Sequence, residues 1–327
     1  MKTMKEVAQR AGVSTATVSH VINNTRFVGR EVKAKVLTAM EELHYIPNSV
    51  ARSLRNQKSF IIGLLVPDIS NFFFTAIAEG LEKVLSEKGY HLIISSTREN
   101  IEVEINKVKL LEGNFIDGLV IATSANNYSE LFNSIKGDYP VVLIDRKPEN
   151  YTGLSVLVDN EKGAFNAVDI LIKRGHKRIG LITGIEGLST SKERLKGYME
   201  AFKYNNIPVY NNLIRAGNSK YEGGYNLTKE LSKESISALF VTNNLMSIGA
   251  LTALKELKLR VPEDIALIGF DDYPWTNIIS PSLSVVKQPS FQIGEVAGEL
   301  IIKKIKGEVI KEEEIILNTT LIIRDSI

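Results

Sequence analysis

The sequence predicts a small all-α N-terminal module followed by an α/β body of two lobes, each built on a doubly wound parallel sheet. Residues 4–23 show apolar positions at helical spacing on both sides of a glycine. From residue 60 onward, short continuous apolar runs alternate with amphipathic segments, which is the pattern of buried parallel strands joined by helices. This alternation occurs as two similar series, and so two lobes are expected.

The composition is that of a soluble chain with more than one domain. A chain of 327 residues is longer than a single core usually supports, and its 44% hydrophobic residues are enough for real cores. No apolar run approaches the roughly 18 residues that span a membrane, and the first residues lack a signal segment. The chain has no cysteine and four histidines, which argues against disulfides and zinc. We therefore expect a cytoplasmic protein with no metal, no cofactor and no membrane partner.

The net charge of +2 conceals an uneven distribution. Residues 1–58 contain ten Lys and Arg against four Asp and Glu, whereas the remainder contains 30 against 34. A basic module on a mildly acidic body is typical of phosphate contact, and hence of nucleic-acid binding. The alternative is a basic, solvated helix pair, and this alternative does not predict the residue types described next.

The stretch 4–23 predicts two helices separated by a tight turn. Gly12 interrupts the first helix, because glycine adopts the left-handed backbone that ends a helix without a steric penalty. Ser14 is a good N-cap for the second helix. The apolar positions of the two helices are Val7, Ala8, Ala11, Val18, Val21 and Ile22. This layout is a helix-turn-helix, whose second helix enters the DNA major groove.

The outward face of the second helix carries short side chains that reach base edges and phosphates, in place of a solvated Glu and Lys face. Base contacts are expected from Thr15, Ala16 and His20. Phosphate contacts are expected mostly from Ser14, Thr17, Ser19 and Asn23. An ordinary helical hairpin is the alternative for this stretch taken in isolation.

A third amphipathic helix over 30–43 is expected to close the small core. Its apolar residues are Val32, Val36, Leu37, Met40 and Leu43. Pro47 then stops the helix, and Asn48 or Ser49 can cap a short fourth one. The predicted division is a DNA-binding domain at 1–46, a hinge helix and linker at 47–59, and an effector-binding and dimerisation domain at 60–327.

The body divides into two series of strands. The first series of apolar runs lies at 60–66, 90–95, 118–121, 141–145 and 156–159, and the second at 179–183, 238–241 and 265–270 with one further short strand. A helix and two strand-like runs at 315–317 and 321–323 complete the chain. The first lobe is expected to comprise about 60–159 plus 290–320, and the second about 160–289 plus the C-terminal strand.

A binding cleft is expected outside the carboxyl ends of these strands. Residues that follow strand ends or open helices include Asn71, Phe73, Phe74, Asp145, Arg146, Arg194, Asn243, Asp271 and Gln288. Carboxylates, arginines and amides bind neighbouring hydroxyls, and aromatic faces stack on sugar rings. Taken singly, Asp145 and Asp271 fit helix caps, the phenylalanines fit a core, and Arg194 fits a solvated charge. However, the three consecutive aromatics at 72–74 cannot share one helix face.

An enzyme is not expected. The sequence shows no nucleophile–base pair, no phosphate loop and no metal cluster, and the glycines at 184–187 lack the dinucleotide fingerprint.

These motifs resemble the LacI/GalR family of bacterial transcriptional repressors. The resemblance of residues 1–57 to the family's headpiece and hinge helix rests on the segments 13–23, 45–48 and 51–54. The segment 13–23 is especially similar to the recognition helix of the family's purine repressors. Residues 60–327 resemble the periplasmic-binding-protein fold that this family carries.

The resemblance implies a homodimeric repressor on a pseudo-palindromic double-stranded operator. It adds Tyr45 and Ala51 to the DNA-binding set. Leu54 would enter the minor groove as an apolar wedge, with Arg55 reading the groove beside it. The order of the hinge helix would depend on the separation of the first lobes, which closure around an effector changes.

The effector set resembles that of ribose-binding proteins. The resemblance covers Asn71, Phe73, Phe74, Arg146, Arg194, Asn243, Asp271 and Gln288, and the expected effector set adds Thr190 and Trp275. An aromatic position of that family falls near Ser219, so Tyr221 or Trp275 is expected to rebuild the wall. Leu188 stands where purine repressors carry a base-reading arginine, which favours a pentose, a related sugar or a sugar acid, with Lys192 adding charge for a carboxylate. A purine or a phosphoprotein corepressor is the alternative effector.

Overall fold

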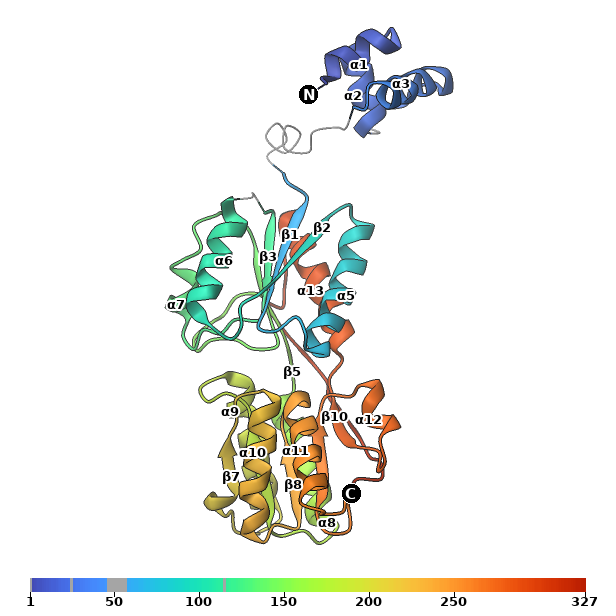
Figure 1. Cartoon of the computed structure of the whole chain (residues 1–327). Helices are drawn as coiled ribbons and strands as arrows, with labels where there is room; N and C mark the ends of the chain where they lie inside the picture. The colour runs from blue at the N-terminus through green and yellow to red at the C-terminus, as the bar shows by residue number, and fades with distance from the viewer. Residues whose placement is uncertain (1, 24–25, 46–57, 114–115) are drawn as a thin grey trace. The chain divides into compact units, whose positions relative to one another are not determined.

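The computed structural model describes residues 2–23, 26–45, 58–113 and 116–327. The chain forms two compact units, Met1–Ser59 and Phe60–Ile327 (Figure 1). The hinge helix expected at 47–59 lies almost entirely outside the described residues. Within those residues, no helix has the length and apolar character needed to cross a membrane.

The N-terminal unit contains the three predicted helices, α1 (Met4–Ala11), α2 (Thr15–Asn23) and α3 (Arg30–Glu42). Gly12 ends α1 with a φ of +66°. The Ser14 hydroxyl accepts a hydrogen bond from the Thr17 backbone N–H at 3.1 Å, as expected of an N-cap. The turn and the cap predicted from the sequence are therefore present.

The core of this unit is formed by one face of each helix. Its buried residues are Val7, Ala8, Ala11, Val18, Val21, Val36 and Ala39. The prediction that Leu37 belongs to this core is wrong, because its side chain is 44% exposed. Val36 and Ala39 define the inner face of α3, and a residue adjacent to Val36 is turned about 100° away from that face. Met40 and Leu43 pack against the core as predicted, while Val32 is half-buried.

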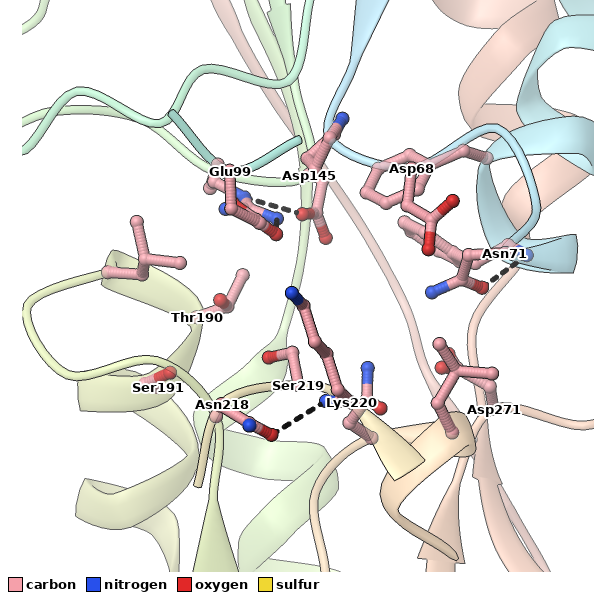
Figure 2. Close-up of a pocket in the computed structure, with 18 of the residues that line it drawn as sticks. Asp68, Asn71, Glu99, Asp145, Thr190, Ser191, Asn218, Ser219, Lys220 and Asp271 are labelled. Atoms are coloured by element: carbon pink, nitrogen blue, oxygen red, sulfur yellow. Dashed lines mark hydrogen bonds and ion pairs between the residues drawn. The ribbon is translucent and has the colours of Figure 1, made fainter. Parts of the chain in front are cut away.

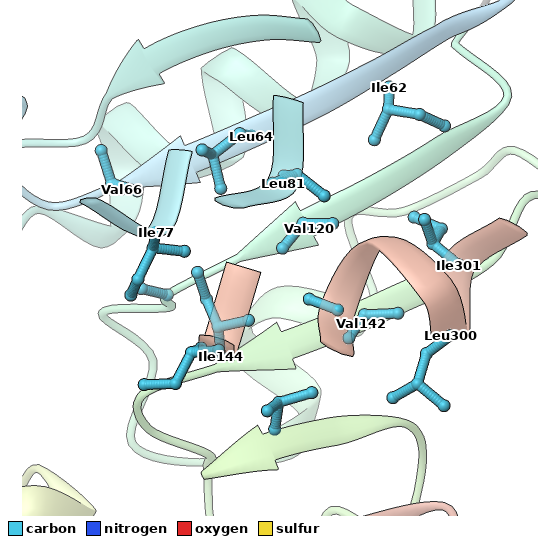
Figure 3. Close-up of a cluster of buried hydrophobic side chains, with 14 of the residues drawn as sticks. Ile62, Leu64, Val66, Ile77, Leu81, Val120, Val142, Ile144, Leu300 and Ile301 are labelled. Carbon is cyan, nitrogen blue, oxygen red and sulfur yellow. The ribbon is translucent and has the colours of Figure 1, made fainter. Parts of the chain in front are cut away.

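The first lobe is a six-stranded parallel sheet in the order β11-β5-β4-β3-β1-β2. Its strands are β1 (Ile61–Val66), β2 (His91–Ser96), β3 (Gly118–Ile121), β4 (Val141–Ile144), β5 (Ser155–Val158) and β11 (Glu314–Leu317). Its helices are α5 (Phe72–Glu87), α6 (Ile101–Gly113), α7 (Tyr128–Phe132) and α13 (Ser290–Ile305). Helices α5 and α13 cover one face and α6 and α7 the other. Figure 3 shows the core between α5, α13 and the sheet.

The second lobe repeats this architecture in the order β12-β10-β9-β8-β6-β7. Its strands are β6 (Ile179–Thr183), β7 (Ile214–Ala216), β8 (Ala238–Val241), β9 (Ala266–Phe270), β10 (Ser284–Lys287) and β12 (Thr320–Ile322), of which β12 pairs antiparallel. Its helices are α8 (Asn160–Lys173), α9 (Ser189–Tyr204), α10 (Tyr221–Leu231), α11 (Asn244–Glu256) and α12 (Pro274–Ile278), with 3₁₀ turns η1 (Asn211–Leu213) and η2 (Ser232–Glu234).

The predicted fold class is confirmed. The chain passes between the lobes three times, after β5, after β10 and after β11. Strand β10 was not predicted, because its four residues include only two apolar ones, Val285 and Val286, between Ser284 and Lys287. Such a short run lacks the continuous apolar pattern that identified the other buried strands.

Helices α5 and α13 approach each other through glycines. A Cβ atom added at Gly294 would lie 2.0 Å from the Ile77 carbonyl oxygen, and one at Gly80 would lie 2.0 Å from the Phe291 carbonyl oxygen. Both clashes are with backbone, which a side-chain rotation cannot relieve. The close packing of these two helices therefore requires glycine at both positions.

We expect Gly294→Ala to lower the free energy of unfolding by about 1–3 kcal/mol, because the added methyl group forces α13 away from α5. Urea denaturation measures this change. Gly113→Ala is the matched control, since no atom of the described residues lies within 4 Å of its added Cβ. A Gly294→Ala protein as stable as the control would contradict the close approach of the two helices.

Candidate functional site

The second helix of the N-terminal unit presents the surface predicted for DNA contact. Val18 and Val21 are buried and fix α2 on the core. On the opposite side Ser14, Thr15 and Ala16 are exposed. The side chains that are half-buried are Thr17, Ser19 and His20. The structure thus separates a core-facing stripe from a face of small and short polar groups, as the sequence predicts.

The other residues predicted to contact DNA lie outside the exposed face of α2 or outside the described residues. Tyr45 is half-buried and packs against the core of the N-terminal unit. The side chain of Asn23 is not described, and Ala51, Leu54 and Arg55 lie outside the described residues.

A cavity of about 390 Å³ lies between the two lobes, at the carboxyl ends of both parallel sheets. The first lobe contributes the segments after β1, β2 and β4, and the second lobe those after β6 to β10. Figure 2 shows Asp68, Asn71, Glu99 and Asp145 on the first-lobe side, opposite Thr190, Asn218, Lys220 and Asp271 of the second lobe.

Nine of the ten predicted effector-site residues line this cavity. They are Asn71, Phe73, Phe74, Arg146, Thr190, Arg194, Asn243, Asp271 and Gln288. The phenylalanines divide as helix geometry requires, with Phe73 and Phe74 buried and Phe72 61% exposed. Separate segments of both lobes therefore bring the predicted set together.

The prediction for Trp275 is wrong. Its ring belongs to α12 and packs against a hydrophobic core of the second lobe, so it does not line the cavity. Tyr221 does not rebuild the aromatic wall either, because its ring stacks on Tyr225 with centroids 6.1 Å apart. The wall at this place is formed by Asn218, Ser219 and Lys220.

Lys192 also differs from the prediction. Its ammonium group forms an ion pair with Glu149 at 2.6 Å and does not line the cavity. It therefore does not supply the expected charge for a carboxylate there.

The guanidinium of Arg146 is buried and held by two carboxylates. Nη1 and Nη2 donate to the two Glu99 oxygens at 2.8 and 3.1 Å, and Nε donates to Asp145 Oδ2 at 3.1 Å. These charges raise the pKa of Arg146 despite the opposing effect of burial. The bidentate geometry orients this side chain before any ligand arrives.

The guanidinium of Arg194 is held from the opposite lobe. Nε donates to Asn160 Oδ1 at 2.8 Å and Nη1 to the Thr242 carbonyl oxygen at 2.7 Å, with the Phe270 ring centroid 3.8 Å from the guanidinium carbon. Burial lowers the pKa of Arg194, and the Asp271 charge opposes this effect. Among the described residues Nη2 has no hydrogen-bond partner, so it is available to a ligand.

Asp271 and Gln288 form a buried pair beside Arg194. Gln288 Nε2 donates to Asp271 Oδ1 at 2.6 Å. Burial raises the pKa of Asp271 to about 6, although Arg194 and Gln288 both favour its charged form. Gln288 is only 6% exposed, and its Oε1 accepts no hydrogen bond from the described residues. An orphaned buried acceptor is costly unless something donates to it.

Two of these carboxylates sit on strained backbone at equivalent strand ends. Asp145 follows β4 with a φ of +65°, and Asp271 follows β9 with a φ of +73°. Neither is the N-cap of a helix, so the alternative of helix caps does not hold for them. Asp tolerates the left-handed region better than most residues, and strain of this kind clusters at ligand sites.

Asn71 connects the site to the contact between the lobes. Its Oδ1 caps α5 by accepting from the Phe73 N–H at 3.0 Å, and it also accepts from Asn244 Nδ2 of the second lobe at 2.8 Å. Beside it, the rings of Phe72 and Tyr273 meet across the lobes with centroids 5.5 Å apart. A ligand that contacts Asn71 therefore acts next to the lobe–lobe contact.

Comparison with known proteins identifies the family. Residues 3–48 match the bacterial regulatory proteins of the lacI family, and residues 168–327 match the periplasmic binding protein-like domain. The HTH-type transcriptional repressor PurR of Photobacterium profundum is 34% identical over 330 residues, covering 100% of this chain and 99% of the relative. The chain belongs to the lacI family of bacterial regulatory proteins.

Two solved structures of similar proteins cover the full length of this LacI-family chain or nearly so. The lac repressor dimer bound to operator and the anti-inducer ONPF is 27% identical, covers 99% of this chain and 98% of its own, and has a TM-score of 0.87. The complex of the transcriptional regulator CelR with cellobiose is 29% identical, covers 100% of both chains, and has a TM-score of 0.76. The present chain is a DNA-binding regulatory protein and not an enzyme.

Several cavity residues of this LacI-family regulator were missed by the sequence reasoning. Glu99 and Arg98 follow β2, and Asn218 and Lys220 follow β7. Their signal was the same as that of the residues found, namely polar side chains directly after a strand. Strand β7 has only three residues, so its end was not located well enough to use the signal.

We expect Asp271→Asn to stabilise the ligand-free protein at neutral pH. The pKa of this carboxyl is higher in the folded protein than in the unfolded chain, so stability falls as pH rises between about pH 4 and pH 6. A pKa near 6 against the usual 3.8 corresponds to a cost of up to about 3 kcal/mol at pH 7. Urea denaturation at pH 4 and pH 7 should show this difference only at pH 7.

Asp138→Asn, at an exposed carboxylate, is the control and should match the parent at both pH values. An Asp271→Asn protein less stable than the parent at pH 7 would mean that the attraction to Arg194 outweighs the cost of burial.

Proposed function

We propose that the protein is a transcriptional repressor that binds a pseudo-palindromic operator as a homodimer in the cytoplasm. A small polyhydroxylated molecule, a sugar or sugar acid, in the cavity between the lobes controls its affinity for operator. The structure of α2 supports the DNA part of this proposal, and the hydrogen-bonding groups of the cavity support the effector part.

The DNA part rests on the two-sided character of α2. Its buried valines fix the helix on the core, while Thr15 and Ala16 at its N-terminal end are exposed. Base contacts in helix-turn-helix proteins come from the N-terminal residues of this helix. The dimer is supported by the lac repressor, whose similar structure is a dimer bound to operator. A dimer places two such helices on two half-sites.

The effector part rests above all on the buried Oε1 of Gln288, which accepts no hydrogen bond from any residue that the structure describes. This acceptor lies in the same cavity as a free donor, Arg194 Nη2, and a charged acceptor, Asp271. A hydroxyl group donates and accepts at once, and neighbouring hydroxyls on one ring can satisfy all three. Phe73 and Phe74 supply apolar surface for the C–H side of such a ring.

A purine is the second candidate, and relatives favour it. Curated relatives of this chain at 32–36% identity have the name PurR, the repressor name already met in Photobacterium profundum, and this name supports a purine effector. The cavity lining argues the other way. A flat base stacks best between two apolar surfaces, whereas the second lobe lines the cavity mostly with polar groups, among them Asn218, Ser219 and Lys220, beside Leu188 and Leu245.

We expect a thermal-shift screen of the full-length protein to discriminate these effectors. A ligand at about 100 times its dissociation constant adds roughly 2.7 kcal/mol of stability, which moves the melting temperature by a few degrees. Sugars and sugar acids should give the shift, and purine bases should not. If only purines raise the melting temperature, the effector is a purine and not a sugar. A panel with no hit would favour a phosphoprotein corepressor.

We expect Ala16→Glu to weaken operator binding by about tenfold to a hundredfold, because a carboxylate on this face faces base edges and phosphates. Fluorescence anisotropy with an operator selected from random DNA measures the affinity. Ala34→Glu makes the same change at an exposed alanine of α3 and should bind like the parent. Equal losses in both variants would count against α2 as the recognition helix.

A further inference from the structure

We propose that the effector carries an anionic substituent, a carboxylate or a phosphate, and that Lys220 is the residue that selects for it. This inference rests on the proposed sugar-type effector and narrows its chemical class. It starts from the wall of the cavity where the sequence led us to expect an aromatic ring and the structure has a lysine.

Lys220 is presented to the cavity by a defined piece of backbone. Asn218 Oδ1 accepts a hydrogen bond from the Lys220 backbone N–H at 3.0 Å, and Ser219 between them has a φ of +58°. The side chain extends from this turn into the cavity between the lobes (Figure 2). The turn therefore places an ammonium group, a strong donor, where a ring face was expected.

Lys220 has an exposed side chain, and its ammonium group has no counter-ion in the described part of the chain. Among the residues that the structure describes, it forms neither an ion pair nor a hydrogen bond, and the same holds for the guanidinium of Arg98 across the cavity. Most of the carboxylate oxygens nearby have other partners. Both Glu99 oxygens accept from Arg146, which also binds Asp145, and Asp271 accepts from Gln288. Lys220 and Arg98 thus form no ion pair with the four carboxylates of the lining, Asp68, Glu99, Asp145 and Asp271, in the part of the chain that the structure describes, although the lining holds four cations for these four acids.

The backbone next to Lys220 also favours a negatively charged ligand. The cavity receives the N-termini of helices from both lobes, and Asn71 and Asn243 cap α5 and α11 with their side chains. In contrast, the N-cap residues of α9 and α10 are Leu188 and Lys220, and neither caps its helix with a side-chain hydrogen bond in the described structure. Uncapped helix N-termini have unsatisfied N–H groups and favour negative charge. Lys220 and these N–H groups lie on the same lobe of the cavity.

A neutral sugar would leave these cations unpaired, and a ring stacked against this wall would meet polar atoms. A sugar with an anionic group places its ring near Phe73 and its charge near Lys220. Charge-assisted hydrogen bonds of this kind are about twice as strong as neutral ones. The alternative use of Lys220 is an ion pair with Asp145 when the lobes move, and this use predicts no preference for anionic ligands.

The test is isothermal titration calorimetry of the full-length protein with matched sets of ligands. One set is ribose, ribonate and ribose 5-phosphate, and the other is glucose, gluconate and glucose 6-phosphate. An anionic member should bind at least about tenfold tighter than its neutral counterpart. A gain in affinity for ribonate or gluconate identifies the anionic group as a carboxylate. A gain for the sugar phosphates identifies it as a phosphate.

Variants of Lys220 test whether this residue causes the preference for anionic ligands. Lys220→Met should remove the tenfold preference for the anionic ligand over its neutral counterpart, and Lys220→Arg should retain this preference. Lys177→Met is the matched control, because Lys177 is an exposed lysine before β6, at the end of the sheet away from the cavity. It should bind every ligand as the parent does.

Three results would overturn the inference. If a neutral sugar binds as tightly as its anionic counterparts, the proposal of a sugar-type effector is kept, and the inference that the effector carries an anionic group is wrong. If Lys220→Met still binds the anionic ligand more tightly than the neutral one, Lys220 does not select for the anionic group. If no sugar of either set binds, the proposed effector class and this inference fail together.

Discussion

The parallel arrangement of strands in both lobes is the constraint on which the site depends. In a parallel sheet every strand ends at the same edge, and the helix that follows begins there. The two lobes meet at these edges, so polar residues distant in sequence converge on one cavity. This explains why Asn71, Arg146, Arg194 and Asp271, each placed after a strand or at the start of a helix, share a site although they come from four different segments.

The cavity between the lobes is costly to the folded protein. Asp271 is buried on a left-handed backbone with a raised pKa, and Gln288 has an acceptor without a donor among the described residues. Natural sites store such strain and unmet hydrogen bonding where a ligand will relieve it. The groups that cost stability in the free protein are therefore the same groups that would give a ligand its binding energy.

The sequence was sufficient for the fold and for most of the site, for different reasons. Buried parallel strands have continuous apolar runs, so periodicity located them, except for β10 with only two apolar residues. Site residues were found because they follow these strands or open the next helix, and because the set resembles that of ribose-binding proteins. Orientation was not predictable. Trp275 and Lys220 both lie after strands, but only packing decides that the ring turns into the core and the lysine into the cavity. The exposed Leu37 shows the same limit within a helix.

The close packing of the first lobe restricts how a bound effector acts on the rest of the molecule. Phe73 and Phe74 belong to α5, which meets α13 through Gly80 and Gly294 with no room for a methyl group. Packed cores of this kind resist gradual deformation and move as units. Asn71 caps α5 and also binds Asn244 of the second lobe. The proposed effector would therefore act at the contact between the lobes, beside two rigidly packed helices of the first lobe.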